Sequence, residues 1–261
     1  MTTWLGLGAG AFVGLEVLAL VAGVGITALG PGGVLIPIAL FTLTSLSPGR
    51  IAGTAIVTHV GTGMLGSAAY VRSRQLRDPL TLRTAGILAG AAVVGAPAGV
   101  ALNAIIGRGL FSVLLGVFVA AIGVLVWLRA RQADPAAAAD AGHPALHPWL
   151  VGGLGFGVAV VSGLFGLGGP LLSVPLLVAV EVPLLAALAA AQAQSIVIAT
   201  TGSIGYVVRG TISWPLALAI AIPELIGVLI GWRIARRVPT HLLMRTLAVV
   251  LVGLAPYLAL R

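Results

Sequence analysis

Ten apolar runs divide this chain, and polar connections separate them. Most of the runs are about 20 residues long, the length that a helix needs to cross the hydrocarbon core of a bilayer. Only 8% of the residues are charged and 59% are hydrophobic, whereas an ordinary soluble domain is about 25% charged. The pattern therefore predicts an all-α integral membrane protein and excludes a soluble globular one. The runs cover residues 4–24, 34–43, 51–71, 84–106 and 110–128 in the first half, and 149–165, 171–180, 184–208, 214–234 and 242–260 in the second.

Both halves repeat the same order of apolar runs: long, short, long, long and long. We therefore expect a first repeat over residues 1–128, a cytoplasmic linker over residues 129–148 and a second repeat over residues 149–261. Each repeat has about five membrane segments, and its second segment is too short to span the bilayer as a regular helix. Local similarities in the same order support a duplication; they pair residues 30–37 with 166–175, 66–71 with 202–207, and 95–99 with 227–231.

The arginines predict the topology, because basic residues accumulate on the cytoplasmic side of a membrane protein. All 14 basic residues are Arg. If each half crosses the membrane five times and the first terminus lies outside, ten arginines are cytoplasmic and four lie outside. If each half crosses four times, the most uneven distribution is eight arginines on one side and six on the other. The larger asymmetry favours five crossings, and an odd number makes the repeats inverted. The ten inside are then Arg72, Arg74, Arg77, Arg83, Arg129, Arg131, Arg233, Arg236, Arg237 and Arg245, and the four outside are Arg50, Arg108, Arg209 and Arg261.

Several functional classes fit the sequence poorly. The arginines that give the net charge of +8 lie in the connections between apolar runs, so we expect no nucleic-acid partner. The chain has no Cys, and the two linker histidines, His143 and His147, are weak evidence for a metal site. No Walker motif is present, and Ser203 lacks the partner motif of an intramembrane serine enzyme. We expect a secondary transporter that needs no cofactor and is not an enzyme.

The Gly- and Pro-rich stretches carry the most information about function. Each interrupts an apolar run directly before a short segment, which predicts irregular backbone followed by a half-helix. Such backbone is tolerated at membrane depth only where it is buried in protein or lines a wet cavity. The free amides and the positive dipole end of a half-helix would suit an anion. The candidate substrate-binding residues are Gly30, Pro31, Gly32 and Gly33 in the first half, and Gly168, Gly169 and Pro170 in the second.

Glycine also allows close helix packing in membranes. For the Gly-x-x-x-Gly spacings at residues 6–10, 95–99 and 227–231 we favour this packing role. For the two Gly- and Pro-rich stretches we favour the binding role, because Pro31 and Pro170 break a regular helix there.

Polar side chains within the long runs could donate hydrogen bonds to an oxyanion. Thr54 and Thr58 share a helical face, and Gln194 and Ser195 lie in the corresponding run of the second half. The alternative is that such side chains bond their own backbone or a neighbouring helix. Both possibilities stay open.

Three ionisable residues fall well inside the predicted spans: Glu16, His59 and Glu224. Ionisable groups are costly in hydrocarbon and indicate function by default, and His changes charge near neutral pH. We treat the three as candidates for proton coupling. The alternative is that each stays neutral and hydrogen-bonded.

The paired Gly-rich stretches, followed by Pro37 and Pro175, resemble the TauE/SafE family of membrane transporters, often called sulfite exporters. The segment Gly53-Thr54-Ala55 is similar to the Gly-Thr-Ser of that family, with Ala55 in place of Ser. Residues 191–195, the second-half counterpart, carry Gln where Thr is common, and which Gln corresponds to Thr54 is open. The resemblance covers nearly the whole chain and implies export of sulfite, sulfoacetate or sulfolactate.

The sequence as a whole predicts a secondary transporter that exports a small anion, with sulfite or a small organosulfonate preferred. Two repeats would alternate access around an anion site at the midplane of the bilayer. Alternative functions are uptake or channel conduction of another small solute or a metal ion, and an intramembrane enzyme. We expect a multi-pass protein of the cell membrane, namely a prokaryotic inner membrane. Protons and a second copy of the chain, in a homodimer, are candidate partners.

Overall fold

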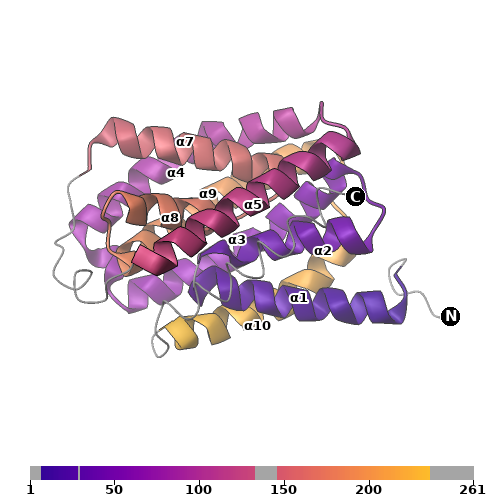
Figure 1. The fold of residues 1–261 in the computed structure, drawn as a ribbon, viewed down its shortest axis with the longest axis horizontal. Coiled ribbons are helices and arrows are strands. Elements are labelled where there is room, and N and C mark those ends of the chain that lie inside the picture. Colours follow the sequence, from indigo (N-terminus) through magenta and orange to yellow (C-terminus); the bar gives the residue numbers. More distant parts are fainter. Residues whose placement is uncertain (1–6, 29, 133–145, 236–261) are drawn as a thin grey trace.

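The computed structural model describes residues 7–28, 30–132 and 146–235, and within these residues the protein is helical and contains no strand. The predicted tenth run (242–260), residues 4–6 of the first run and most of the predicted linker lie outside the described residues. Nine α-helices and two short 3₁₀ helices make up the described chain (Figure 1). They are α1 (Ala9–Ala28), η1 (Pro31–Val34), α2 (Leu35–Leu43), α3 (Pro48–Arg72), η2 (Gln75–Arg77), α4 (Pro79–Asn103), α5 (Arg108–Gln132), α7 (Pro148–Phe165), α8 (Pro170–Ala179), α9 (Leu184–Val208) and α10 (Trp214–Ala235).

The helices follow the predicted apolar runs within a few residues. Five helices, α1, α4, α7, α9 and α10, are long and apolar enough to cross a membrane. Helix α3 is also 25 residues long but is less apolar, because His and several Thr side chains occupy its buried face. Helix α5 continues to Gln132, four residues beyond the predicted end of the fifth run at 128. The prediction of an all-helical membrane protein is confirmed at this level.

Proline and a capping aspartate explain where several of these helices begin. Pro48, Pro79, Pro148 and Pro170 each stand in the first turn of a helix, where the fixed φ of proline suits the helix and its missing N–H costs no hydrogen bond. Asp78 caps α4, since its carboxylate accepts a hydrogen bond from the amide of Thr81 at 2.8 Å.

Helices from the two halves pack against each other in pairs. Helix α1 packs along α10, and α7 packs along α4 on the other side of the bundle (Figure 1). Glycines make these contacts close, because a Cβ atom at Gly227 would collide with the carbonyl of Leu20 and one at Gly163 with the carbonyl of Ala96. The packing role predicted for residues 95–99 and 227–231 is confirmed. Gly10 has no described atom within 4 Å of its Cβ position, and Gly6 lies outside the described residues.

Helices α3 and α9 pack against each other in the middle of the bundle and run antiparallel. Along their contact, Gly53 faces Tyr206, Gly63 faces Ile196, and Gly66 faces Gln192. Along this contact the residue numbers rise in α3 and fall in α9, so the two helices run in opposite directions. The two helices occupy the same place in the two halves of the sequence.

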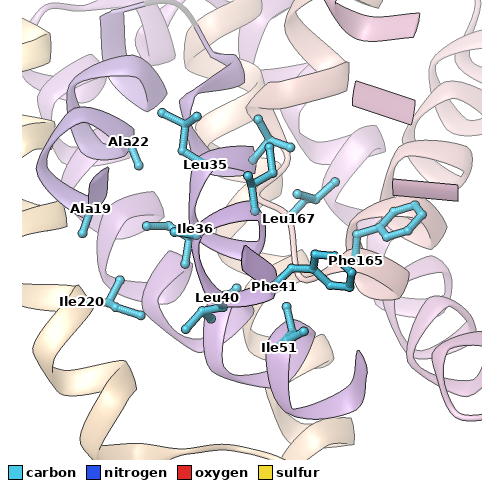
Figure 2. Packing of buried hydrophobic residues seen from close by; sticks show 14 of the residues in the cluster. Ala19, Ala22, Leu35, Ile36, Leu40, Phe41, Ile51, Phe165, Leu167 and Ile220 are labelled. Carbon is cyan, nitrogen blue, oxygen red and sulfur yellow. The ribbon is translucent and has the colours of Figure 1, made fainter. Parts of the chain in front are cut away.

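The short helix α2 lies inside the protein rather than against lipid. All residues from Leu35 to Phe41 are buried. Figure 2 shows Leu35, Ile36, Leu40 and Phe41 among side chains of α1, α3, α10 and the end of α7. The outer faces carry exposed apolar side chains instead, including Val13 on α1 and Leu218 on α10, which are 60% and 65% exposed. Such an apolar outer surface is what a bilayer requires.

Candidate functional site

Each Gly-rich stretch breaks the chain between a long helix and a short one. Gly30 follows α1 with φ of 100°, and Gly166 follows α7 with φ of 77°, a left-handed conformation that costs glycine little. A Cβ atom at Gly166 would also collide with the carbonyl of Ala52 on α3. The predicted half-helices α2 and α8 follow these breaks and are 9 and 10 residues long.

The two breaks meet inside the protein. A Cβ atom at Gly30 would lie 2.8 Å from the carbonyl oxygen of Pro170 and 3.0 Å from Cγ2 of Val174. Beyond this meeting point α2 and α8 lie toward opposite ends of the bundle (Figure 1). Segments that are more than 130 residues apart in sequence thus form one irregular region.

The imidazole of His59 lies between the two breaks. A Cβ atom at Gly33 would stand 3.2 Å from Cε1 and 3.3 Å from Nε2 of this ring, and one at Gly168 would stand 3.6 Å from Cδ2. His59 comes from α3 and is fully buried. A side chain at position 33 would therefore press on the ring, whereas a Cβ atom at position 168 would stand at ordinary van der Waals distance from it.

The carboxyl group of Glu224 on α10 lies close to this histidine. Nδ1 of His59 lies 3.1 Å from Oε1 of Glu224, and both side chains are fully buried. The contact lacks the angle of an aligned hydrogen bond. Within the described residues, Nε2 of His59 and Oε2 of Glu224 have no hydrogen-bond partner. Buried polar atoms are nearly always paired, so these two are unusual.

Ser195 of α9 connects the second break to the same place. Its Oγ accepts a hydrogen bond from the amide of Gly169 at 3.3 Å, at the start of α8. Its Oγ would also be 3.3 Å from a Cβ atom at Gly168. The amide of Gly168 itself forms no hydrogen bond with the described residues. Gly168 thus has an amide without a partner among the described residues, and its Cβ position faces the histidine ring.

The remaining predicted polar residues bind protein groups. Gln194 accepts a hydrogen bond from Ser173 and donates one to the carbonyl of Gly155 at 3.1 Å, so it joins α8 to α7. The hydroxyl of Thr54 accepts from the amide of Ser213 at 3.0 Å. Thr58 donates to the carbonyl of Ala55 in its own helix at 2.9 Å.

The other predicted residues flank this region or lie apart from it. Gly32 packs tightly against the backbone of α1, Pro31 begins η1 and Pro170 begins α8. Glu16 lies on α1, is partly exposed and forms no ion pair with a described residue. We define the glycine junction as Gly33, His59, Gly168, Gly169, Ser195 and Glu224, which the structure brings together.

Two tyrosines that the sequence analysis did not single out anchor the breaks. The hydroxyl of Tyr70 donates to the carbonyl of Thr27 at 3.2 Å, and that of Tyr206 donates to the carbonyl of Gly163 at 2.7 Å. Each acceptor lies three residues before the left-handed glycine, and each pair is 43 residues apart. The signal was present in the similarity between residues 66–71 and 202–207.

Arg108 was predicted only as a charge outside the membrane, and the structure gives it a second role. Its guanidinium donates to the carbonyls of Phe41, Thr44 and Leu46 and lies 4.6 Å from the centre of the Phe41 ring. It thus satisfies carbonyls at the end of α2, where a helix leaves acceptors free. No sequence pattern around Arg108 indicates this contact.

The described residues contain no group of three or more His, Asp or Glu side chains that could hold a metal ion. Residues 15–258 of the 261 match the family model described as Sulfite exporter TauE/SafE. The comparisons with curated proteins and with solved structures gave no match. The family resemblance that the Gly-rich stretches indicated is confirmed: this multi-pass membrane transport protein belongs to the TauE/SafE family of sulfite exporters.

Proposed function

We propose that this protein exports a small oxyanion, sulfite or a small organosulfonate, through the glycine junction. One observation carries the proposal: the ring of His59 lies between Gly33 of the first break and Gly168 of the second. A protonated imidazole, the free amide of Gly168 and the starts of two short helices all favour negative charge. The family match supports transport of a small anion.

Alternating access of two inverted repeats is the mechanism that we propose. Helices α3 and α9 run antiparallel. In both halves a tyrosine hydroxyl binds a carbonyl 43 residues earlier in the chain. The helix pairs α1–α10 and α4–α7 each join a helix of the first half to one of the second. These relationships support a two-fold relation in the membrane plane, which is typical of transporters that rock around a central site. The arginine distribution supports the opposite orientation of the repeats.

The membrane potential supports the outward direction. Moving one negative charge out of a cell with a negative interior is favourable by about 2.3 kcal/mol per 100 mV, so an exported anion needs no ATP. We place the protein in the cell membrane of a prokaryote on the basis of its family. Gly33, Gly168, Gly169 and Ser195 are the proposed substrate contacts, while Thr54 and Gln194 hold neighbouring segments in this conformation and Thr58 bonds within its own helix.

Flux into and out of liposomes tests the function directly. The full chain is reconstituted, and the movement of sulfite, sulfate, thiosulfate and methanesulfonate is measured at fixed pH and voltage. We expect sulfite or methanesulfonate to move, with a rate that follows the imposed gradient and voltage. Equal permeation of all four anions, without saturation, would indicate a channel and contradict the proposal.

A matched pair of glycine variants tests the site. Gly33→Leu places a side chain against His59 and is expected to abolish flux, whereas Gly86→Leu on α4, where no described atom lies within 4 Å of the Cβ position, should retain it. Full flux in Gly33→Leu, at equal amounts of inserted protein, would place the substrate elsewhere.

A further inference from the structure

We propose that His59 is the side chain that holds the transported anion, that Glu224 is its positioning residue, and that each anion binds together with one proton taken up at Nε2 of His59. This inference rests on the proposed function and assigns the chemistry of the same site. It names the substrate class as an oxyanion that only accepts hydrogen bonds.

The two nitrogens of the imidazole face different groups. Nδ1 lies 3.1 Å from the carboxylate of Glu224, while Nε2 points to the side where Gly33 offers only backbone. A carboxylate on one ring nitrogen holds the orientation and tautomer and leaves the other nitrogen for a ligand. Nε2 is fully buried and has no hydrogen-bond partner among the described residues, and of the two ring nitrogens it is the one that does not face the carboxyl group of Glu224.

Protonation decides whether Nε2 can bind an oxyanion. In the neutral tautomer that carries its proton on Nδ1, facing Glu224, Nε2 is an acceptor that repels sulfur-bound oxygen atoms. In the protonated ring Nε2–H donates. Binding of an anion without hydrogen-bond donors therefore requires a proton on Nε2. Because Nδ1 keeps its own proton against Glu224 in the protonated ring, this second proton is drawn from solution when the anion binds.

The charges around the ring are few. The neighbours of the ring are Gly168 of the second break, Ser195 of α9, Gly33 of η1 and Glu224 of α10. Among the described residues, Glu224 is the one charged side chain in contact with the ring. With His59 protonated, Glu224 ionised and a monovalent anion bound, one negative charge is left. The two short-helix starts, each equivalent to about half a positive charge, offset it. A divalent anion would leave a second negative charge buried, which is costly.

A methanesulfonate binding experiment isolates the proton on the protein. Sulfite itself changes protonation near neutral pH, but methanesulfonate keeps its single charge. We would measure its affinity for the purified full chain by calorimetry from about pH 5 to about pH 9, and proton uptake with a dye in weak buffer. On the alkaline limb we expect a loss of affinity of about tenfold per pH unit, with close to one proton taken up per anion.

Two substitutions assign the proton to the pair. His59→Gln keeps a donor amide that does not titrate, so the anion should bind more weakly but without pH dependence and without proton uptake. Glu224→Gln removes the carboxyl group that faces Nδ1, so the pH profile of binding should differ from that of the wild type while binding at acid pH persists. The control is Glu181→Gln, an exposed carboxyl in the loop after α8, which should leave the pH profile unchanged.

The outcomes separate this inference from the proposed function. If methanesulfonate or sulfite is transported but wild-type protein takes up no proton, or if His59→Gln keeps the wild-type pH profile, the inference is wrong and the export proposal stands. If no oxyanion binds or moves at any pH, both are wrong. A pH profile of Glu224→Gln identical to wild type would remove Glu224 from the positioning role.

Discussion

The hydroxyl of Tyr206 donates a 2.7 Å hydrogen bond to the carbonyl of Gly163, one helical turn before the chain breaks at Gly166. Tyr70 repeats the contact with Thr27 at 3.2 Å, three residues before Gly30. Because both acceptors lie at the ends of helices that lead into a break, the tyrosines tie α7 to α9 and α1 to α3. The two ends are thereby held while the breaks between them and the short helices remain irregular.

Removing either hydroxyl should therefore slow transport more than it weakens binding. Tyr206→Phe leaves the ring in place but leaves a buried carbonyl unpaired, at a cost of about 1–3 kcal/mol. We expect a lower maximal flux with little change in KM, and a smaller effect for Tyr70→Phe because its bond is longer. Thr201→Val is the control, since it removes a hydroxyl bonded only within its own helix. Equal flux in all three variants would show that the tyrosines only fill space.

Gly30 offers a test of how closely the two breaks must approach. Gly30→Ala places a side chain in a left-handed conformation and against the carbonyl of Pro170. Gly210→Ala, also at a positive φ but with no described atom within 4 Å, carries the backbone strain alone, about 1–2 kcal/mol. We expect Gly30→Ala to lower the melting temperature in detergent clearly more and to reduce flux. Equal melting temperatures of the two variants would mean that the close approach of Gly30 to Pro170 does not contribute to stability.

The sequence predicted the architecture well because apolar length and Gly-Pro breaks are local signals. The half-helices at 34–43 and 171–180 were expected where α2 and α8 lie, since a run of about 10 residues cannot span a bilayer. The role of His59 was harder to predict. Its position between Gly33 and Gly168 depends on packing between segments that no local pattern joins.

Other contacts could not be predicted, for a similar physical reason. A buried polar side chain bonds whatever backbone the fold brings to it, so Gln194 reaches Gly155 while Thr54 receives the amide of Ser213. The spacing of Thr54 and Thr58 correctly indicated one buried face, but a face does not specify its partner. Tyr70 and Tyr206 were detectable as a repeated motif, although the motif does not name the acceptors.

The close glycine contacts within the helix pairs α1–α10 and α4–α7 should contribute to the stability of the protein. Gly227→Ala would press a methyl group on the carbonyl of Leu20, and forcing such a contact typically costs about 1–3 kcal/mol. Gly10→Ala, on α1 with open space around it, should be neutral or slightly stabilising because alanine favours the helix. Thermal unfolding in detergent, followed by circular dichroism, compares the two. Unfolding of Gly227→Ala at or above the wild-type temperature would contradict the packing role.

Arg108 provides the last test, because its guanidinium holds the free end of the buried helix α2. It donates to the carbonyls of Phe41, Thr44 and Leu46, and only the planar fork of arginine reaches several acceptors at once while lying over a ring. Arg108→Lys keeps the charge but not this geometry, so we expect a lower melting temperature and a lower flux. Arg50→Lys, an exposed arginine at the start of α3, is the matched control and should behave like wild type. If Arg108→Lys also behaves like wild type, its charge rather than its contact with α2 is what the protein needs.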